Sequence, residues 1–165
     1  MSDHNLTLRI DTEAGPLDLD VRHFAVKAET NRPYQIDLVA YSRDAGIDLD
    51  TVIGLPGTFT LQAGARGDSP ILTEAKPRKW TGIVSEAAHV TAEEEGYSTY
   101  RIRIVPRLWL LTQRTDIRIF QHLSELEIVL RILDGWEIPT TLRVDRDGHL
   151  RREYRTQYEE TDFDF

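Results

Sequence analysis

The sequence contains no cysteine among its 165 residues. Disulfide bonds, thiolate zinc sites and cysteine nucleophiles are therefore excluded, and the redox state of the compartment stays open. Long apolar runs are also missing, because no stretch approaches the roughly 20 residues that a membrane-spanning helix needs. The N-terminus, MSDHNLTLRI, lacks the basic start and the apolar run of a signal peptide. We expect a protein made in the cytoplasm that inserts no segment into a membrane.

Positive charge is scarce in this chain. Lys and Arg total 20 against 28 Asp and Glu, so the formal net charge is −8. Nucleic acids and anionic membrane surfaces attract proteins through clustered positive charge, so we expect no nucleic-acid partner. Hydrophobic residues make up 40% and charged residues 29%, as in an ordinary folded domain. The length suits one full domain, or one domain plus part of another.

The residue patterns that carry catalysis or bind a cofactor are also missing. None of the five histidines stands four residues from another, as a metal site on one helix would require. The acidic cluster of Asp44, Asp48 and Asp50 has a misplaced glycine and no terminal glutamate, so it is not an EF-hand loop. We therefore expect no enzymatic activity, no metal and no cofactor. An enzyme would need distant side chains to converge.

The first two thirds of the chain have the pattern of short β-strands. Breakers such as Gly15-Pro16 and the run GLPG at 54–57 separate stretches in which apolar and polar residues alternate. These stretches lie at 6–10, 17–21, 34–38, 59–61, 80–84 and 100–104. Many short strands with turns between them are typical of an antiparallel sandwich or barrel. Residues 63–78 contain several glycines and prolines, so we expect a long exposed loop there.

The pattern changes after Pro106. Ser124 and Glu127 have the spacing of a capping box, which predicts a helix that ends near Gly135. Its apolar residues at helical spacing are Leu126, Val129, Leu130 and Leu133. Further on, residues 141–144 and 150–158 flank Asp147-Gly148, a pattern typical of a β-hairpin.

Two further features of this part bear on where the chain's elements end and meet. Thr161 resembles the N-cap of a helix, which we interpret as an element cut short at the end of a fragment. The run LWLL at 108–111 is apolar without alternation. It is either core at a domain junction or a subunit contact, and we expect Trp109 to be buried.

The segment from Tyr100 to Gln121, YRIRIVPRLWLLTQRTDIRIFQ, resembles the signature of VgrG (TssI) proteins. These are the spike proteins of type VI secretion systems, and their N-terminal part is similar to the tail hub of contractile phages. Two further stretches match the family, WTGIV at 80–84 and REYRTQYEETDFDF at 152–165. The resemblance covers essentially the whole chain. Departures lie at 23–27, which reads HFAVK, and in the long loop from residue 63.

The resemblance implies a mainly β protein. An antiparallel β-barrel over residues 1–107 would be followed by the start of an α+β hub domain over residues 108–165, which is truncated. The implied role is non-enzymatic: a hub portion that forms a homotrimer in the full-length protein and caps the hexameric Hcp tube. Baseplate components and effectors are the other implied partners, and the protein would leave the cytoplasm with the spike. Structural or interface candidates are Trp80, Trp109, Leu110, Arg118, Phe120, Phe163 and Phe165.

Two other interpretations stay open. The tail hub of a phage or phage-like particle would carry similar motifs, and gene neighbourhood would separate it from a secretion spike. A small ligand-binding β-barrel would need exposed aromatic and basic side chains on one face of a sheet. Alternation places Tyr100 on the opposite strand face from Arg101 and Arg103.

Overall fold

The computed structural model describes residues 6–44, 46–62, 76–92, 96–145 and 148–165. The long loop expected at 63–78 lies mostly outside these residues. The chain divides into two compact units, Met1–Pro106 and Arg107–Phe165, and each is described by itself. Within the described residues, no helix is long and apolar enough to cross a membrane.

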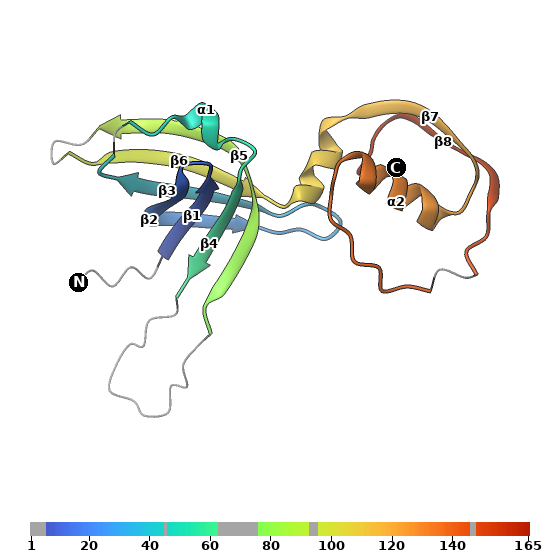
Figure 1. The fold of residues 1–165 in the computed structure, drawn as a ribbon, viewed down its shortest axis with the longest axis horizontal. Helices are drawn as coiled ribbons and strands as arrows, with labels where there is room; N and C mark the ends of the chain where they lie inside the picture. The colour runs from blue at the N-terminus through green and yellow to red at the C-terminus, as the bar shows by residue number, and fades with distance from the viewer. Residues whose placement is uncertain (1–5, 45, 63–75, 93–95, 146–147) are drawn as a thin grey trace. The chain divides into compact units, whose positions relative to one another are not determined.

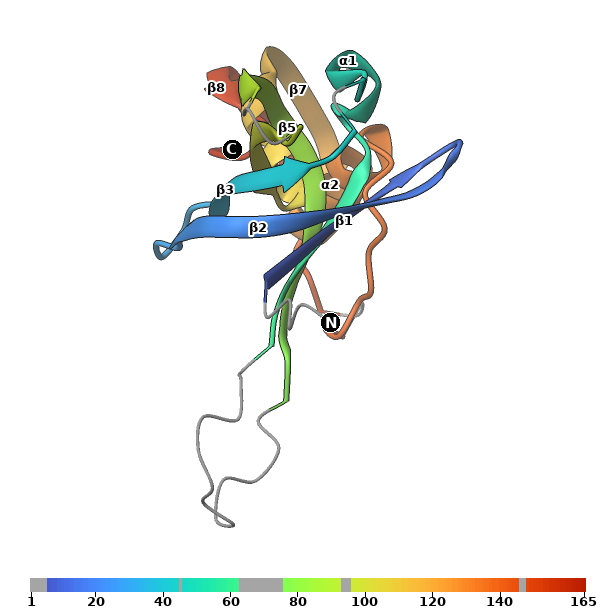
Figure 2. The ribbon, with the colours of Figure 1, turned by 90° about the vertical axis from the view of Figure 1, so that its left-hand side faces the viewer.

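The first unit is a closed antiparallel barrel, which confirms the fold class expected from the sequence. Its six strands follow one another around the barrel in the order β1-β2-β3-β6-β5-β4 (Figures 1 and 2). The strands are β1 (Leu6–Thr12), β2 (Gly15–Lys27), β3 (Gln35–Ser42), β4 (Pro56–Leu61), β5 (Arg78–Ala92) and β6 (Ser98–Val105). Closure pairs β1 with β4, so the two strands that would be the edges of an open sheet are hydrogen-bonded to each other.

Alternate residues of each strand fill the barrel. Leu8 and Ile10 on β1, for example, are fully buried, while Arg9 between them is exposed. Strand alternation therefore produces the core directly from sequence. The buried side chains are Leu8, Ile10, Leu19, Val21, Ile36, Leu38, Ala40, Val52, Phe59, Val84, Tyr100, Ile102 and Ile104.

One residue of the acidic cluster, Asp48, caps a short helix. Helix α1 (Leu49–Val52) begins after Asp48, whose carboxylate accepts a hydrogen bond from the Asp50 backbone N–H at 3.2 Å. The helix packs against β5. Among the residues that the structure describes, no group of three or more His, Asp or Glu could hold a metal ion.

The second unit combines a 3₁₀ helix, one α-helix and a two-stranded sheet. The elements are η1 (Arg107–Gln113), β7 (Thr115–Leu123), α2 (Glu125–Gly135) and β8 (Arg152–Thr161). Strands β7 and β8 pair antiparallel and arch over α2 (Figure 1). The hairpin expected between 141–144 and 150–158 is wrong, because residues 141–144 form no strand and β8 pairs with β7 instead. A local hairpin would have left β7 without a backbone partner.

Helix α2 begins as the sequence predicts. The Ser124 hydroxyl accepts from the Glu127 backbone N–H, and the Glu127 carboxylate accepts from the Ser124 backbone N–H at 2.8 Å. The buried face differs from the expected one: Ile128 and Ile132 are buried, whereas Val129 is half exposed. The helix has apolar residues on more than one side, and packing against the rest of the unit determines that the side with Ile128 and Ile132 is buried.

We predict that Gly82→Ala destabilises the barrel. A Cβ atom at Gly82 would lie 2.1 Å from the backbone oxygen of Val105 on β6, so the strands would have to move apart. Overpacking of this kind costs about 1–3 kcal/mol. Urea denaturation would measure the loss. Gly135→Ala is the matched control, because a Cβ there meets nothing within 4 Å. An unchanged free energy of unfolding for Gly82→Ala would contradict the close approach.

We also predict that Ser124→Ala weakens α2 by about 1 kcal/mol, because the Glu127 amide loses its acceptor. Faster hydrogen exchange of the first-turn amides would report this loss. Ser124→Asp keeps an acceptor at the cap and serves as the control. Equal exchange rates in wild type and Ser124→Ala would refute the cap.

Candidate functional site

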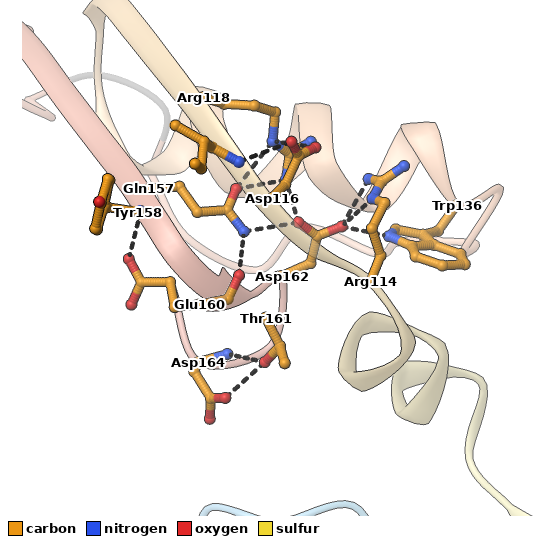
Figure 3. A network of polar contacts seen from close by, with 11 residues as sticks. Arg114, Asp116, Arg118, Trp136, Gln157, Tyr158, Glu160, Thr161, Asp162 and Asp164 are labelled. Atoms are coloured by element: carbon orange, nitrogen blue, oxygen red, sulfur yellow. Dashed lines mark hydrogen bonds and ion pairs between the residues drawn. The ribbon is translucent and has the colours of Figure 1, made fainter.

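A buried carboxylate lies at the centre of the second unit. The side chain of Asp162 is fully inaccessible to solvent, and its two oxygens accept five hydrogen bonds (Figure 3). Oδ2 accepts from Arg114 Nε at 3.0 Å, Arg114 Nη2 at 2.6 Å and the Trp136 indole N–H at 2.7 Å. Oδ1 accepts from Gln157 Nε2 at 3.0 Å and from Arg118 Nη2. The donors therefore come from β7, from β8, from the residue before β7 and from the residue after α2.

Arg118 and Gln157 extend this network across the sheet. They are directly opposite on β7 and β8, and the Gln157 side-chain oxygen accepts from Arg118 Nε at 2.9 Å and from Nη2 at 2.6 Å. Gln157 is fully buried and also donates to the Glu160 backbone oxygen at 3.0 Å. Asp116 Oδ2 lies 3.2 Å from Arg118 Nε, so Arg118 forms ion pairs with two carboxylates, those of Asp116 and Asp162. The inner face of the sheet is therefore polar at its centre.

Opposing effects set the pKa of Asp162. Burial by itself raises the pKa of this carboxyl, because a low-dielectric surrounding disfavours charge. Hydrogen bonds from Trp136, Gln157 and Arg114, together with the charge of Arg118, lower the pKa further than burial raises it. The pKa therefore lies below its ordinary value, and Asp162 is ionised at neutral pH.

An apolar pocket of about 280 Å³ opens beside this network. Its walls come from η1, α2, β8 and the turn that follows β8. The lining residues are Leu108, Leu111, Glu125, Ile128, Val129, Ile132, Leu133, Arg155, Asp162, Phe163 and Phe165. Phe165 stacks on the buried Phe120, with ring centroids 5.6 Å apart, so the turn is held against the core.

The opposite face of the β7–β8 sheet is also apolar, but it is open to solvent. Ile117, Ile119, Tyr154 and Tyr158 are exposed by 59%, 65%, 64% and 64%. We call these four residues the outer patch. Ile117 lies directly opposite Tyr158, and Ile119 and Tyr154 lie diagonally across the two strands. Four large side chains thus form one continuous exposed surface, which is unusual unless something covers it.

The structure brings together four of the residues singled out from the sequence. Arg118 holds Asp162, Phe120 is buried, and Phe163 and Phe165 line the apolar pocket. Trp80 lies in the other unit, where it stacks on Phe59 with ring centroids 5.5 Å apart.

The expectation that Trp109 is buried is wrong. Trp109 and Leu110 are half-buried, and within the run at 108–111 the buried side chain is Leu111. The run forms the 3₁₀ helix η1, which has about three residues per turn. When Leu111 points into the core, a residue two positions earlier must point elsewhere.

Sequence reasoning missed the centre of this site. Asp162 was interpreted as part of a helix start, and Arg114, Trp136 and Gln157 were not singled out. The outer patch was also missed, although the alternation of Ile117 and Ile119 with polar residues in TDIRIFQ signals a strand.

This arrangement suits a structural role rather than proton transfer. A carboxylate offers about four lone-pair positions, and Asp162 already accepts five N–H bonds. No position remains on it for a substrate proton. What these hydrogen bonds do is hold the turn at 161–165 against β7 and the end of α2.

We predict that Asp162→Asn lowers the free energy of unfolding of the second unit at pH 7 by about 2–4 kcal/mol, because two arginines lose their buried counter-charge. The folded-state pKa is depressed, so this stabilisation is present above the unfolded-state pKa of about 4 and is lost as pH falls through the folded-state value. The difference between wild type and variant should therefore shrink below about pH 4.

Urea titrations between pH 3 and pH 7 would measure this difference. Asp164→Asn is the matched control, because Asp164 is exposed and contacts only Thr161 among the described side chains. If both variants had the same stability, Asp162 would not have the proposed structural role.

Comparison with known proteins adds the family. Type VI secretion system spike protein VgrG1b of Pseudomonas aeruginosa is 26% identical over 158 residues, which are 96% of this chain and 20% of that protein. Spike protein VgrG4b of the same species is 32% identical over 150 residues, which are 90% of this chain and 17% of that protein. The resemblance to VgrG spike proteins is thus confirmed, and the chain spans about a fifth of the length of these relatives.

Two solved structures share the fold. The Escherichia coli c3393 protein, a component of the type VI secretion system, matches with a TM-score of 0.59 at 19% identity, over 86% of this chain and 40% of that one. The 43 kDa tail protein of prophage MuSo2 from Shewanella oneidensis matches with a TM-score of 0.63 at 11% identity, over 98% of this chain and 48% of that one. The model of the phage tail baseplate hub (GPD) family matches residues 27–165, and the chain belongs to that family.

Proposed function

We propose that this chain is the N-terminal hub portion of a type VI secretion spike, with a structural and non-enzymatic role. The observation that carries the proposal is the match to VgrG spike proteins over 90–96% of the chain. In this role three copies form a ring that caps the hexameric Hcp tube. Baseplate components and effectors are further partners, and the protein waits in the cytoplasm until the spike is exported.

The barrel has the properties that a ring component needs. Its interior is filled by side chains, and its six strands close into a barrel, so it contacts partners through its outer wall. That wall carries charge pairs across neighbouring strands. Arg103 Nε on β6 lies 2.7 Å from Asp37 Oδ1 on β3, and the Arg103 guanidinium also forms an ion pair with Glu86 on β5. A polar wall of this kind keeps a free subunit soluble before assembly.

The division of the chain supports the same proposal. We propose that the second unit is part of the α+β hub domain implied by the resemblance, with the barrel as a separate domain before it. In such hubs each of three subunits contributes two barrels, so a threefold ring can match a sixfold tube. The barrel described here would be one of the two.

A phage or phage-like tail hub is the second candidate. The family model that matches is a phage tail baseplate hub, and one structural neighbour is a prophage tail protein. The sequence relatives at 26–32% identity are secretion spike proteins, so we favour the secretion machine.

We predict that the purified chain binds the hexameric Hcp tube protein of its own organism. Sedimentation of the mixture should show a complex of three chains with one hexamer. A phage tube protein serves as the control and should not bind. Preference for the phage tube would favour the second candidate, and binding to neither tube would refute the proposed role.

A further inference from the structure

The outer wall of the barrel is hollowed where β2 lies between β1 and β3. The hollow measures about 600 Å³, within the usual range for sites that bind small molecules. Its walls come from these three strands, from the residue after β3 and from the residue before β6. The lining residues are Thr7, Asp18, Leu19, Asp20, Tyr41, Ser42, Arg43 and Tyr97. All of them belong to the first unit, whereas the outer patch and the apolar pocket belong to the second.

The strand register lines up polar side chains across this wall. Thr7 on β1 is opposite Asp20 on β2, and Asp20 is opposite Tyr41 on β3. Each of the three follows or precedes a residue that is buried in the barrel, so alternation turns the row outward. Asp18 lies two residues before Asp20 on β2 and therefore faces the same way. Two carboxylates and a phenol thus share one outward face.

Two tyrosines hold two arginines flat against the wall. The rings of Tyr41 and Tyr97 meet edge to face, with centroids 5.7 Å apart. Arg22, the extra residue of the β2 bulge, has its Cζ 4.4 Å from the Tyr41 centroid, and Arg43 has its Cζ 5.1 Å from the Tyr97 centroid. Arg43 Nε also donates to the Tyr97 hydroxyl at 2.8 Å. A guanidinium stacked on a ring has its N–H groups in a fixed plane, so they are oriented before a ligand arrives.

Charges of both signs occur together at this wall. Asp18 and Asp20 project from β2, Arg22 and Arg43 stack on the tyrosines, and Arg9 Nη1 lies 3.9 Å from Asp18 Oδ1. An anion such as a phosphate group would meet the carboxylates, and a cation would meet the guanidiniums. A hydroxyl can donate to a carboxylate and also accept from a guanidinium. The surface therefore matches a neutral ligand with several hydroxyl groups.

The Tyr41 hydroxyl adds one more donor and acceptor. Burial raises the pKa of this phenol, the charge of Asp20 raises it further, and the charge of Arg22 opposes this only in part. The pKa therefore lies above its ordinary value, and the phenol keeps its proton at neutral pH.

From these observations we propose that the hollow binds a neutral oligosaccharide. Sugar hydroxyls donate to Asp18 and Asp20 and accept from Arg43, while the half-buried rings of Tyr41 and Tyr97 contact the apolar faces of the sugar. Small β-barrels of other families bind oligosaccharides on the outer face of their strands. This role goes beyond the hub function and does not depend on it.

Isothermal titration calorimetry tests the proposal with three neutral probes: cellotetraose, maltotetraose and tetra-N-acetylchitotetraose. At least one of them should bind the chain with a dissociation constant of about 1 mM or tighter. A sulfated form of the same sugar and the peptide trilysine should each bind at least tenfold more weakly, because each brings like charges together. If none of the three sugars binds, or if a charged probe binds more tightly, the hollow is not a site for neutral sugars.

Removal of one stacked arginine provides a second test. Arg43→Ala should weaken binding of the sugar about tenfold. Arg78→Ala is the matched control, because Arg78 also stacks on a ring of the barrel, with its Cζ 5.0 Å from the Trp80 centroid, but does not line the hollow. Both arginines are exposed, so we expect both variants to fold. Equal affinities in the two variants would overturn the proposal.

NMR shift mapping on the wild-type chain locates the sugar without any substitution. The backbone amides that shift should gather at residues 7, 18–20, 41–43 and 97. Shifts centred on β7 and β8 would place the sugar on the outer patch instead, where two tyrosines are exposed, and would overturn the proposal.

Discussion

The second unit depends on one buried carboxylate. Removing a charged group from water costs several kcal/mol unless other groups satisfy it, and Asp162 has no access to water. The chain meets this demand with donors from the residue before β7, the middle of β7, the residue after α2 and the middle of β8. The donors come from three separate stretches of the chain, at 114–118, 136 and 157, so satisfying one side chain fixes the arrangement of three elements and the turn at 161–165.

The same demand explains why Ile117, Ile119 and Tyr158 of the sheet face outward. Arg118 and Gln157 must face inward to reach Asp162. Because side chains alternate along a strand, their neighbours Ile117, Ile119 and Tyr158 must then face outward. An exposed patch is therefore the geometric consequence of a polar centre on the inner face. Burying the patch against another molecule would recover the hydrophobic free energy that this arrangement leaves unused.

The barrel could be predicted from sequence, whereas the second unit could only partly be. Strand alternation places Leu8 and Ile10 inward, and the cap of Ser124 depends on residues three apart. The pairing of β7 with β8 joins residues that are at least 29 positions apart, and no local pattern encodes it. Alternation in β7 shows a strand but not which face is buried, because the usual rule would bury Ile117 and Ile119. The role of Asp162 appears only once its four partners have converged.

The two units are stabilised by different interactions. The described part of the barrel buries a cluster of thirteen apolar side chains, and its six strands close on one another, so its own strands suffice to complete it. The described part of the second unit buries a cluster of four, Leu111, Phe120, Ile128 and Ile132, and adds the Asp162 network. A core that small supplies little hydrophobic free energy. The unit therefore has the most to gain from covering its outer patch and its pocket, and assembly would stabilise the part of the chain that packs least on its own.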